Sequence, residues 1–245
     1  MGEEKLTRLN KYLSEIGYCS RRAADKLLDD QRIKINGKIA VMGLKIGPMD
    51  RIEIDGKNVQ IPAKSDRVYL MVNKPTGIVC TTDTRVEKDN IVDFINYPSR
   101  IFPIGRLDKA SEGLLLMTDD GDIVNKILRS RNHHEKEYIV KVDQVITESF
   151  LSKMRSGIPM LETMTKPCYV SAINKHEFKI ILTQGLNRQI RRMCAFLDYQ
   201  VVSLQRIRIM NIKLDIPYGK WRNLREEELI KLHGLLEHSA KTFDE

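Results

Sequence analysis

The chain has 245 residues, of which 42% are hydrophobic and 30% charged, and its net charge is +8. This balance is typical of a globular protein with one large domain or two unequal ones, and it excludes a disordered chain. No stretch approaches the roughly 18 apolar residues of a membrane span, so we expect no membrane contact, and the positive charge favours polyanionic partners.

The beginning of the chain and its cysteines bear on location and redox chemistry. "MGEEKLTRLNKYL" lacks the apolar core of a signal peptide, so the expected location is cytoplasmic. Cys19, Cys80, Cys168 and Cys194 are far apart and form no Cys-x-x-Cys pair. They predict reduced, mostly buried thiols and neither a zinc site nor a dithiol redox centre.

Residues 6–55 predict a helix pair on a small antiparallel sheet. Apolar residues recur at helical spacing from Leu9 to Ile16, Gly17 ends this helix, and Ser20 caps a second one in "RRAADKLLDD". Apolar residues then alternate about Asn36-Gly37 in "RIKINGKIAV", which is the signal of a two-residue hairpin, and "DRIEIDG" adds another strand.

This part of the chain is also basic. Two arginines, Arg21 and Arg22, begin the second helix, where free backbone N–H groups attract phosphate, although a solvated helix face is the alternative interpretation. "TRLNKYLSEIGYCSRRAADKLLDDQRIKINGK" resembles the S4-type RNA-binding domain in its order of helix, Ser-Arg-Arg, helix and Asn-Gly hairpin. The resemblance implies an RNA-binding domain over residues 1–60 with these RNA contacts: Arg8, Lys11, Arg21, Arg22, Lys34 and Lys38.

Residues 56–66 lack a period and predict a linker, and residues 67–245 predict a second domain. "VYLMVNK", "GLLLMT", "EKEYIVKVD", "EFKIILT" and "VVSLQRIRIMNIKL" are typical of strands. "GDIVNKILRS", "ITESFLSKMRSG", "NRQIRRMCAFLD" and "LREEELIKLHGLLE" are typical of helices, with Thr147 as one cap and Asn223 with Glu226 as another. Strands outnumber helices without regular alternation, so we expect an α+β fold with a mixed, largely antiparallel sheet flanked by helices.

In "PIGRLDKASEGLLLMT", Arg106 and Asp108 stand two residues apart before an apolar run. Such a pair usually forms a salt bridge at a turn. The stretch, however, matches the Gly-Arg-Leu-Asp motif of pseudouridine synthases, and "NKPTGIV", "EKEYIV" and "QGLNRQIRRM" follow the same family's order. With the S4-type domain in front, nearly the whole chain resembles the RsuA family of these enzymes.

The resemblance implies isomerisation of uridine to pseudouridine in structured RNA, with no metal and no other cofactor. A stem-loop of large-subunit ribosomal RNA is the expected partner, tRNA is the alternative or additional one, and we expect a monomer. A non-catalytic RNA-binding or ribosome-assembly factor, and a hydrolase using Ser111 or Cys194, are the rival interpretations. The hydrolase is disfavoured because neither nucleophile has a Gly-x-Ser-x-Gly elbow or an evident histidine partner.

The resemblance also assigns residues. Asp108 acts at the sugar as nucleophile or general base, and Arg191 is the cation that keeps it ionised and oriented. Tyr138 stacks on the base and is a candidate for removing the last proton, although a strand tyrosine more often belongs to the core. The resemblance gives Arg106 a role near the displaced nucleotide. Arg188 and Arg192 flank Arg191 on a helix, where neighbouring residues point in different directions, so we expect them to bind RNA phosphates or to serve the structure.

Other groups receive lesser roles. Lys74 is expected to be structural, and the neighbouring His133 and His134 predict a loop contact instead of a metal site. Basic residues gather between positions 188 and 222, and part of this set is expected to form a phosphate track. Its members are Arg188, Arg191, Arg192, Arg206, Arg208, Lys213, Lys220 and Arg222.

Overall fold

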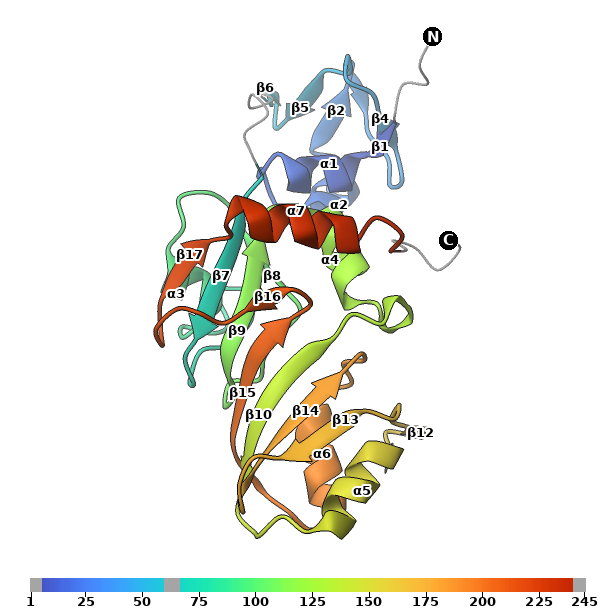
Figure 1. Cartoon of the computed structure of the whole chain (residues 1–245). Helices are drawn as coiled ribbons and strands as arrows, with labels where there is room; N and C mark the ends of the chain where they lie inside the picture. Colours follow the sequence, from blue (N-terminus) through green and yellow to red (C-terminus); the bar gives the residue numbers. More distant parts are fainter. Residues whose placement is uncertain (1–5, 60–66, 240–245) are drawn as a thin grey trace. The chain divides into compact units, whose positions relative to one another are not determined.

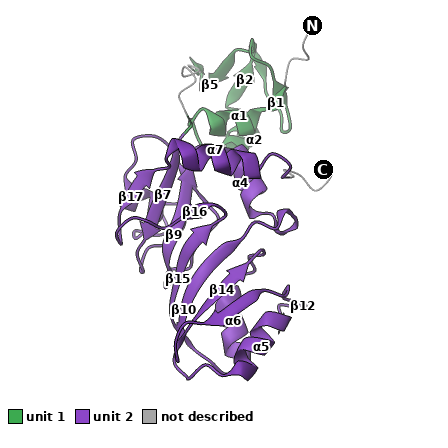
Figure 2. Cartoon of the chain, in the orientation of Figure 1, with its two compact units in different colours: residues 1–67 green, residues 68–245 purple. Residues whose placement is uncertain are grey.

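The computed structural model describes residues 6–59 and 67–239, and the chain divides into two compact units, residues 1–67 and 68–245 (Figures 1 and 2). The first unit contains two helices and two small sheets. Its helices are α1 (Leu9–Glu15) and α2 (Arg21–Asp29). Its strands are β1 (Thr7–Arg8), β2 (Ile33–Ile35), β3 (Lys38–Ile39), β4 (Lys45–Ile46), β5 (Ile52–Ile54) and β6 (Lys57–Asn58).

Local chemistry accounts for the small unit. The Ser20 hydroxyl accepts a hydrogen bond from the Ala23 amide at 3.1 Å and caps α2, as expected. Asn36 and Gly37 have φ values of 51° and 82°, which a two-residue hairpin between β2 and β3 requires. An antiparallel sheet of order β3-β2-β5-β6 results, while β1 pairs with β4.

The boundary of the small sheet differs from the expected linker. Lys57 and Asn58, which the sequence assigns to the linker, pair with Ile54 and Glu53 as an edge strand. The ladder continues here because residues 55 and 56 make a tight turn, with φ values of 53° and 74°. Most of the expected linker, residues 60–66, lies outside the described residues.

The large unit is built on one mixed sheet. Its strands in the main path are β7 (Tyr69–Lys74), β9 (Glu112–Thr118), β10 (Lys136–Val142), β13 (Tyr169–Ala172), β14 (Glu177–Leu182), β15 (Val201–Ile209) and β17 (Trp221–Asn223). The spatial order is β13-β14-β10-β15-β9-β7-β17, with β8 (Phe102–Ile104) beside β9 and β16 (Ile212–Lys213) beside β15. β9 and β15 are parallel and the other pairs antiparallel, which confirms the predicted fold class. A separate hairpin joins β11 (Pro159–Met160) to β12 (Thr163–Met164).

Helices cover both faces of this sheet. One core cluster joins α3 (Ile91–Ile95), α5 (Glu148–Ser156) and α6 (Gln189–Phe196) to strand residues such as Leu70 and Val72. The other joins α4 (Gly121–Leu128) and α7 (Glu226–Leu235) to the alternate residues of the same strand. β7 is therefore buried on both faces, which explains its unbroken apolar run. None of the described helices is both long and apolar enough to cross a membrane.

The last helix does not begin as expected. Asn223 ends β17, paired with Leu70, so it cannot serve as the cap. Arg225 holds the N-cap position, and its amide donates to the Glu228 carboxylate at 2.7 Å. The predicted Asn223–Glu226 box is therefore wrong, because strand pairing shifts the start of the helix by two residues.

Gly113 allows the parallel contact between β9 and β15. Its φ is +100°, and a Cβ there would lie 2.3 Å from the Arg206 carbonyl oxygen and 2.8 Å from its nitrogen. We expect Gly113→Ala to lower the free energy of unfolding by about 2 kcal/mol or more, measured by denaturant titration. Gly121→Ala is the control, since the nearest atom to its Cβ would be 3.9 Å away. Equal stability of the two variants would contradict this role for Gly113.

Candidate active site

A cleft of about 540 Å³ opens in the large unit beside β10 and β15. The loop of residues 105–111 between β8 and β9, called here the Asp108 loop, forms one wall. Residues 184–191, which run into the first turn of α6, line it as well. Asp108 and Tyr138 both line the cleft, and Asp108 is the only acidic residue among the described residues that line it.

The Asp108 loop is held by buried hydrogen bonds. The ammonium of Lys74, fully buried at the end of β7, donates to the carbonyls of Pro75 and Ser111 at 2.8 Å each. The Ser111 amide donates to the Asp108 carbonyl at 3.0 Å, and the Gly77 amide to the Lys109 carbonyl at 2.8 Å. This bonding fits the structural role expected for Lys74, because it fixes the backbone that carries Asp108.

Two arginines face the Asp108 carboxylate. The Arg191 Nε lies 3.9 Å and the Arg188 Nη1 3.7 Å from its Oδ2. Arg191 also donates to the Ala110 carbonyl at 2.9 Å and to the Ser111 hydroxyl at 3.1 Å, so it clamps the Asp108 loop to α6. Burial lowers the pKa of Arg191, and the neighbouring Arg188 lowers it further while Asp108 raises it.

Arg188 approaches Asp108 because of its backbone conformation. Its φ of 50° places it in the left-handed region at the N-cap of α6 instead of on the helix surface. Helical spacing from Arg191 therefore could not place it. Arg192, one residue beyond Arg191, bonds Asn187 instead and makes no ion pair with Asp108.

Tyr138 lies on β10, is 9% exposed, and pairs in register with Arg206 of β15. It belongs to the core cluster and lines the cleft as well. Its hydroxyl makes no hydrogen bond to any residue that the structure describes, whereas the hydroxyl of an ordinary core tyrosine is usually hydrogen-bonded within the protein.

A β-bulge at this point directs the two arginines of β15 to different faces of the sheet. Glu137 pairs with Arg208 and Tyr138 with Arg206, so Ile207 is an extra residue on β15. Arg206 consequently lines the cleft beside Tyr138, while Arg208 bonds Glu137 at 2.7 Å and Glu135 at 2.9 Å. Without the bulge both arginines would share one face of the sheet.

The expected phosphate track is smaller than the sequence indicates. Arg208 is neutralised by two glutamates, and Arg222 is bonded to Asp215 and Glu228 at 2.8 Å each. Arg206 is buried. These three cannot form an exposed track, because each is either paired or enclosed. Arg188 remains exposed at the cleft, and Arg106, which is not part of the expected track, is exposed there as well.

The sequence interpretation missed Lys136 as a member of the cleft, and it placed Arg206 only in the general basic set of residues 188–222. Both line the cleft, and they are 6% and 4% exposed. The available signal was the spacing in "KEYIV", since residues two apart on a strand share a face. The bulge that directs Arg206 has no comparable sequence signal.

The other candidates have ordinary surroundings. His134 contacts the Ser239 hydroxyl at 2.8 Å, and within residues 6–59 and 67–239 no group of three or more His, Cys, Asp or Glu is placed to hold a metal. All four cysteines are free thiols. Burial raises the pKa of Cys194 to about 12, and the Ser111 hydroxyl is bonded to Arg191, so neither is an activated nucleophile.

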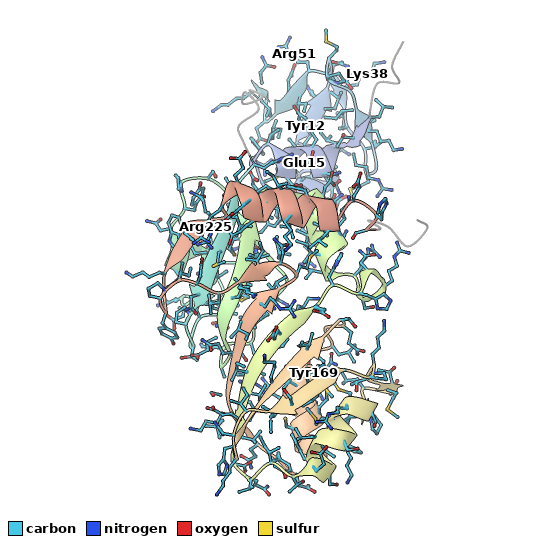
Figure 3. The ribbon with its side chains drawn as sticks, viewed as in Figure 1. Tyr12, Glu15, Lys38, Arg51, Tyr169 and Arg225 are labelled. Carbon is cyan, nitrogen blue, oxygen red and sulfur yellow. The ribbon has the colours of Figure 1, made fainter. Side chains whose placement is uncertain are left out.

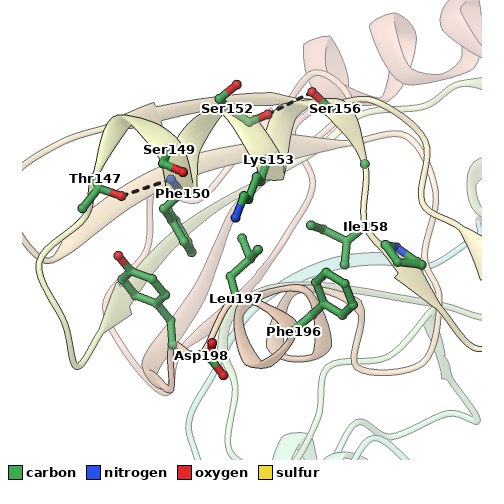
Figure 4. A pocket seen from close by; sticks show the side chains of 13 residues that line it. Thr147, Ser149, Phe150, Ser152, Lys153, Ser156, Ile158, Phe196, Leu197 and Asp198 are labelled. Carbon is green, nitrogen blue, oxygen red and sulfur yellow. Dashed lines mark hydrogen bonds between the residues drawn. The ribbon is translucent and has the colours of Figure 1, made fainter.

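A second hollow, of about 460 Å³, lies between α5 and the end of α6 (Figure 4). Its lining includes one cation, Lys153, and one carboxylate, Asp198, together with Phe150, Phe196 and three serines. The motifs that carry the family resemblance contribute no residue to its described lining. The cleft at Asp108 is therefore the candidate active site.

The small unit carries its basic residues on several surfaces. Arg21 and Arg22 are exposed in the first turn of α2, and Lys34 and Lys38 on β2 and β3. Figure 3 shows Lys38 on the strand side of this unit and Glu15 on α1. Lys11 is ion-paired to Glu15 at 3.4 Å, while Arg8 is exposed on β1.

Both units of the chain are similar to known proteins. The family model described as RNA pseudouridylate synthase matches residues 68–196, and the S4 domain matches residues 7–52. The "Dual-specificity RNA pseudouridine synthase RluF" of Salmonella typhi is 51% identical over 96% of this chain and 81% of its own length. The chain belongs to the RNA pseudouridine synthases.

Two more members of the family are similar along nearly the whole chain. The "Ribosomal large subunit pseudouridine synthase B" of Bacillus subtilis is 32% identical over 97% of this chain and all of its own length. A solved structure called "Crystal structure of pseudouridylate synthase" has a TM-score of 0.67 at 31% identity and covers 92% of this chain and 99% of its own. The RsuA-type pseudouridine synthase recognised from the motifs is confirmed, and its reaction converts uridine to pseudouridine in RNA.

Proposed function

We propose that Asp108, Arg191 and Tyr138 carry out this isomerisation on a flipped-out uridine of a large-subunit ribosomal RNA stem-loop. The observation that carries the proposal is the meeting of Asp108, Arg188 and Arg191 at one cleft with Tyr138. Stem-loops suit the reaction because loop bases are unstacked more easily than paired ones.

The chemistry requires one bond to break and another to form on the same sugar. Asp108 attacks C1′ or removes a sugar proton, and the electron pair of the C1′–N1 bond leaves with the uracil ring. The ring turns and C5 bonds to C1′; at this step the Asp108–C1′ bond breaks in the nucleophile route, or the proton that Asp108 removed returns to the sugar in the base route. The C5 proton is then removed and N1 gains a proton. Arg191 keeps the Asp108 carboxylate ionised and oriented, since a nearby cation favours its charged form.

Tyr138 has two separable roles in the proposal, stacking on the base and accepting the C5 proton. We expect Tyr138→Phe to retain RNA binding but to lower turnover by about 10² to 10⁴-fold, the usual contribution of a general base. Removal of the C5 proton would then limit the rate. In Tyr138→Phe, RNA with deuterium at C5 of the uridine should therefore react more slowly than unlabelled RNA, and this isotope effect should be larger than in wild type. An unchanged rate with no isotope effect would remove the tyrosine from proton transfer.

The S4 unit is proposed to hold the RNA outside the cleft. Arg21 and Arg22 stand in the first turn of α2, where side-chain charge and free N–H groups both attract phosphate. Arg8, Lys11, Lys34 and Lys38 extend that charge, and Arg106, Arg188 and Arg192 are proposed to contact RNA near the target nucleotide. A cytoplasmic monomer remains our prediction for location and oligomeric state.

The RNA class is tested with uridine labelled by tritium at C5, because only pseudouridine formation releases that label. Transcripts of large-subunit stem-loops and of tRNA stem-loops are incubated separately with the full chain. We expect release from a large-subunit stem-loop. The word "dual-specificity" in the name of the Salmonella typhi relative supports a second substrate, for which tRNA is our candidate. Release from tRNA alone would overturn the ribosomal assignment.

A further inference from the structure

Two buried cations beside Tyr138 have no carboxylate partner among the described residues. Lys136 donates to the His134 carbonyl at 3.1 Å, and Arg206 donates through Nε to the Leu114 carbonyl at 2.7 Å. The Arg206 Nη2 is buried with no hydrogen-bond partner. Arg208, two residues further along β15, is less buried yet bonded to two glutamates. The fold thus neutralises Arg208 but leaves Lys136 and Arg206 without a negatively charged partner among the described residues, although burying an unpaired charge is costly.

The charges of the whole cleft also leave Lys136 and Arg206 without a counter-charge. Within residues 6–59 and 67–239, its lining contains one carboxylate, Asp108, and six cations: Arg106, Lys109, Lys136, Arg188, Arg191 and Arg206. Arg188 and Arg191 face Asp108, and Arg106 and Lys109 are exposed on its loop. Lys136 and Arg206 remain on the strands, on the side where Tyr138 lies. An anion bound in this part of the cleft would neutralise these two cations.

We propose that Lys136, supported by Arg206, stabilises the negative charge of the detached uracil while the base turns beside Tyr138. The proposal rests on the proposed function of the cleft. Breaking the C1′–N1 bond leaves its electron pair on the ring, where O2 and O4 share the charge until C5 bonds to C1′. Lys136 forms and breaks no covalent bond, and its role is the same whether Asp108 acts as nucleophile or as base. Fixed cations at developing charge are among the largest catalytic contributions.

The protonation of Lys136 makes the proposal measurable. Burial lowers its pKa to about 8, with Arg206 as the second cause. The groups around it are Arg206 on β15, His133 and His134 on the preceding loop, Tyr138 on its own strand, and the uncharged Leu182 and Gln184 from the β14 side. The ammonium is charged below its pKa and neutral above it. The kcat/KM of wild type should therefore fall as the pH rises through about 8.

Three variants of the full chain separate charge from packing. Lys136→Met removes the charge and should lower the single-turnover rate by about 100-fold, with RNA affinity nearly unchanged. It should unfold at the same or a higher temperature, since replacing a buried charge by an apolar side chain is often neutral or stabilising. Lys136→Arg should retain most activity and move the alkaline fall upward by at least about one pH unit, because a guanidinium stays protonated. Lys141→Met, on the exposed face of β10, is the matched control and should react like wild type.

A better leaving group provides the decisive comparison. Fluorine at C5 withdraws electrons and stabilises the uracil anion. The rate deficit of Lys136→Met relative to wild type should therefore be at least about tenfold smaller on RNA with 5-fluorouridine than on uridine RNA. Breakage of the C1′–N1 bond is measured after digestion of the RNA to nucleosides. A folded Lys136→Met that reacts like wild type, or one whose defect is equal on both RNAs, would overturn the proposal. An inactive wild type would refute the proposed function instead.

Discussion

Asp108→Asn should abolish pseudouridine formation, with a loss of at least about 10⁴-fold, while RNA binding persists. The substitution keeps the shape of the side chain but removes the charge that acts at the sugar. It also leaves Arg188 and Arg191, 3.7 and 3.9 Å away, without the carboxylate that they face. The measurement is tritium release from C5-labelled RNA under single-turnover conditions, with RNA affinity determined in parallel.

Asp93→Asn is a matched control for loss of one negative charge. Asp93 lies on α3, accepts a hydrogen bond from the Asn90 side chain at 2.7 Å, and is absent from the cleft. We expect nearly normal turnover from this variant. Measurable turnover by Asp108→Asn above about a hundredth of wild type would contradict the role of Asp108.

Arg191→Met should also cause a large loss, about 10² to 10³-fold in kcat. The side chain is 14% exposed and holds two parts of the site, the carboxylate of Asp108 and the backbone of its loop at Ala110. Methionine fills a similar volume without either interaction. Arg191→Lys should recover part of the loss, because it restores the charge but not the several directed N–H groups.

Arg192→Met is the control for this prediction, since it removes the same charge one residue later on α6. Its guanidinium bonds Asn187 and not Asp108. We expect its effect to fall on RNA affinity and on the salt dependence of binding instead of on kcat. Equal effects of the two substitutions on kcat would show that Arg191 acts only through overall charge.

The sequence was informative where motifs and local periods determine structure. The Ser20 cap, the Asn36-Gly37 hairpin and the fold class were predicted from residue types at fixed spacing. The meeting of Asp108 and Arg191 was predicted only through a family resemblance, because 83 residues separate them and no local pattern reports such a contact.

The remaining details depend on tertiary structure. The extra residue Ile207 in β15 directs Arg206 to the cleft and Arg208 to two glutamates, whereas plain alternation predicts one face for both. Arg188 reaches Asp108 through a left-handed backbone conformation that its sequence does not signal. Asn223 has the chemistry of a helix cap, but strand pairing with Leu70 takes precedence.

We propose that Asp108 isomerises a particular uridine in large-subunit RNA. The most direct measurement maps pseudouridine at nucleotide resolution in rRNA and tRNA from cells that lack this protein and from the same cells rescued with wild type or Asp108→Asn. We predict that a large-subunit site is lost in the deletion and restored by wild type alone. Unchanged rRNA sites, or full restoration by Asp108→Asn, would contradict the account.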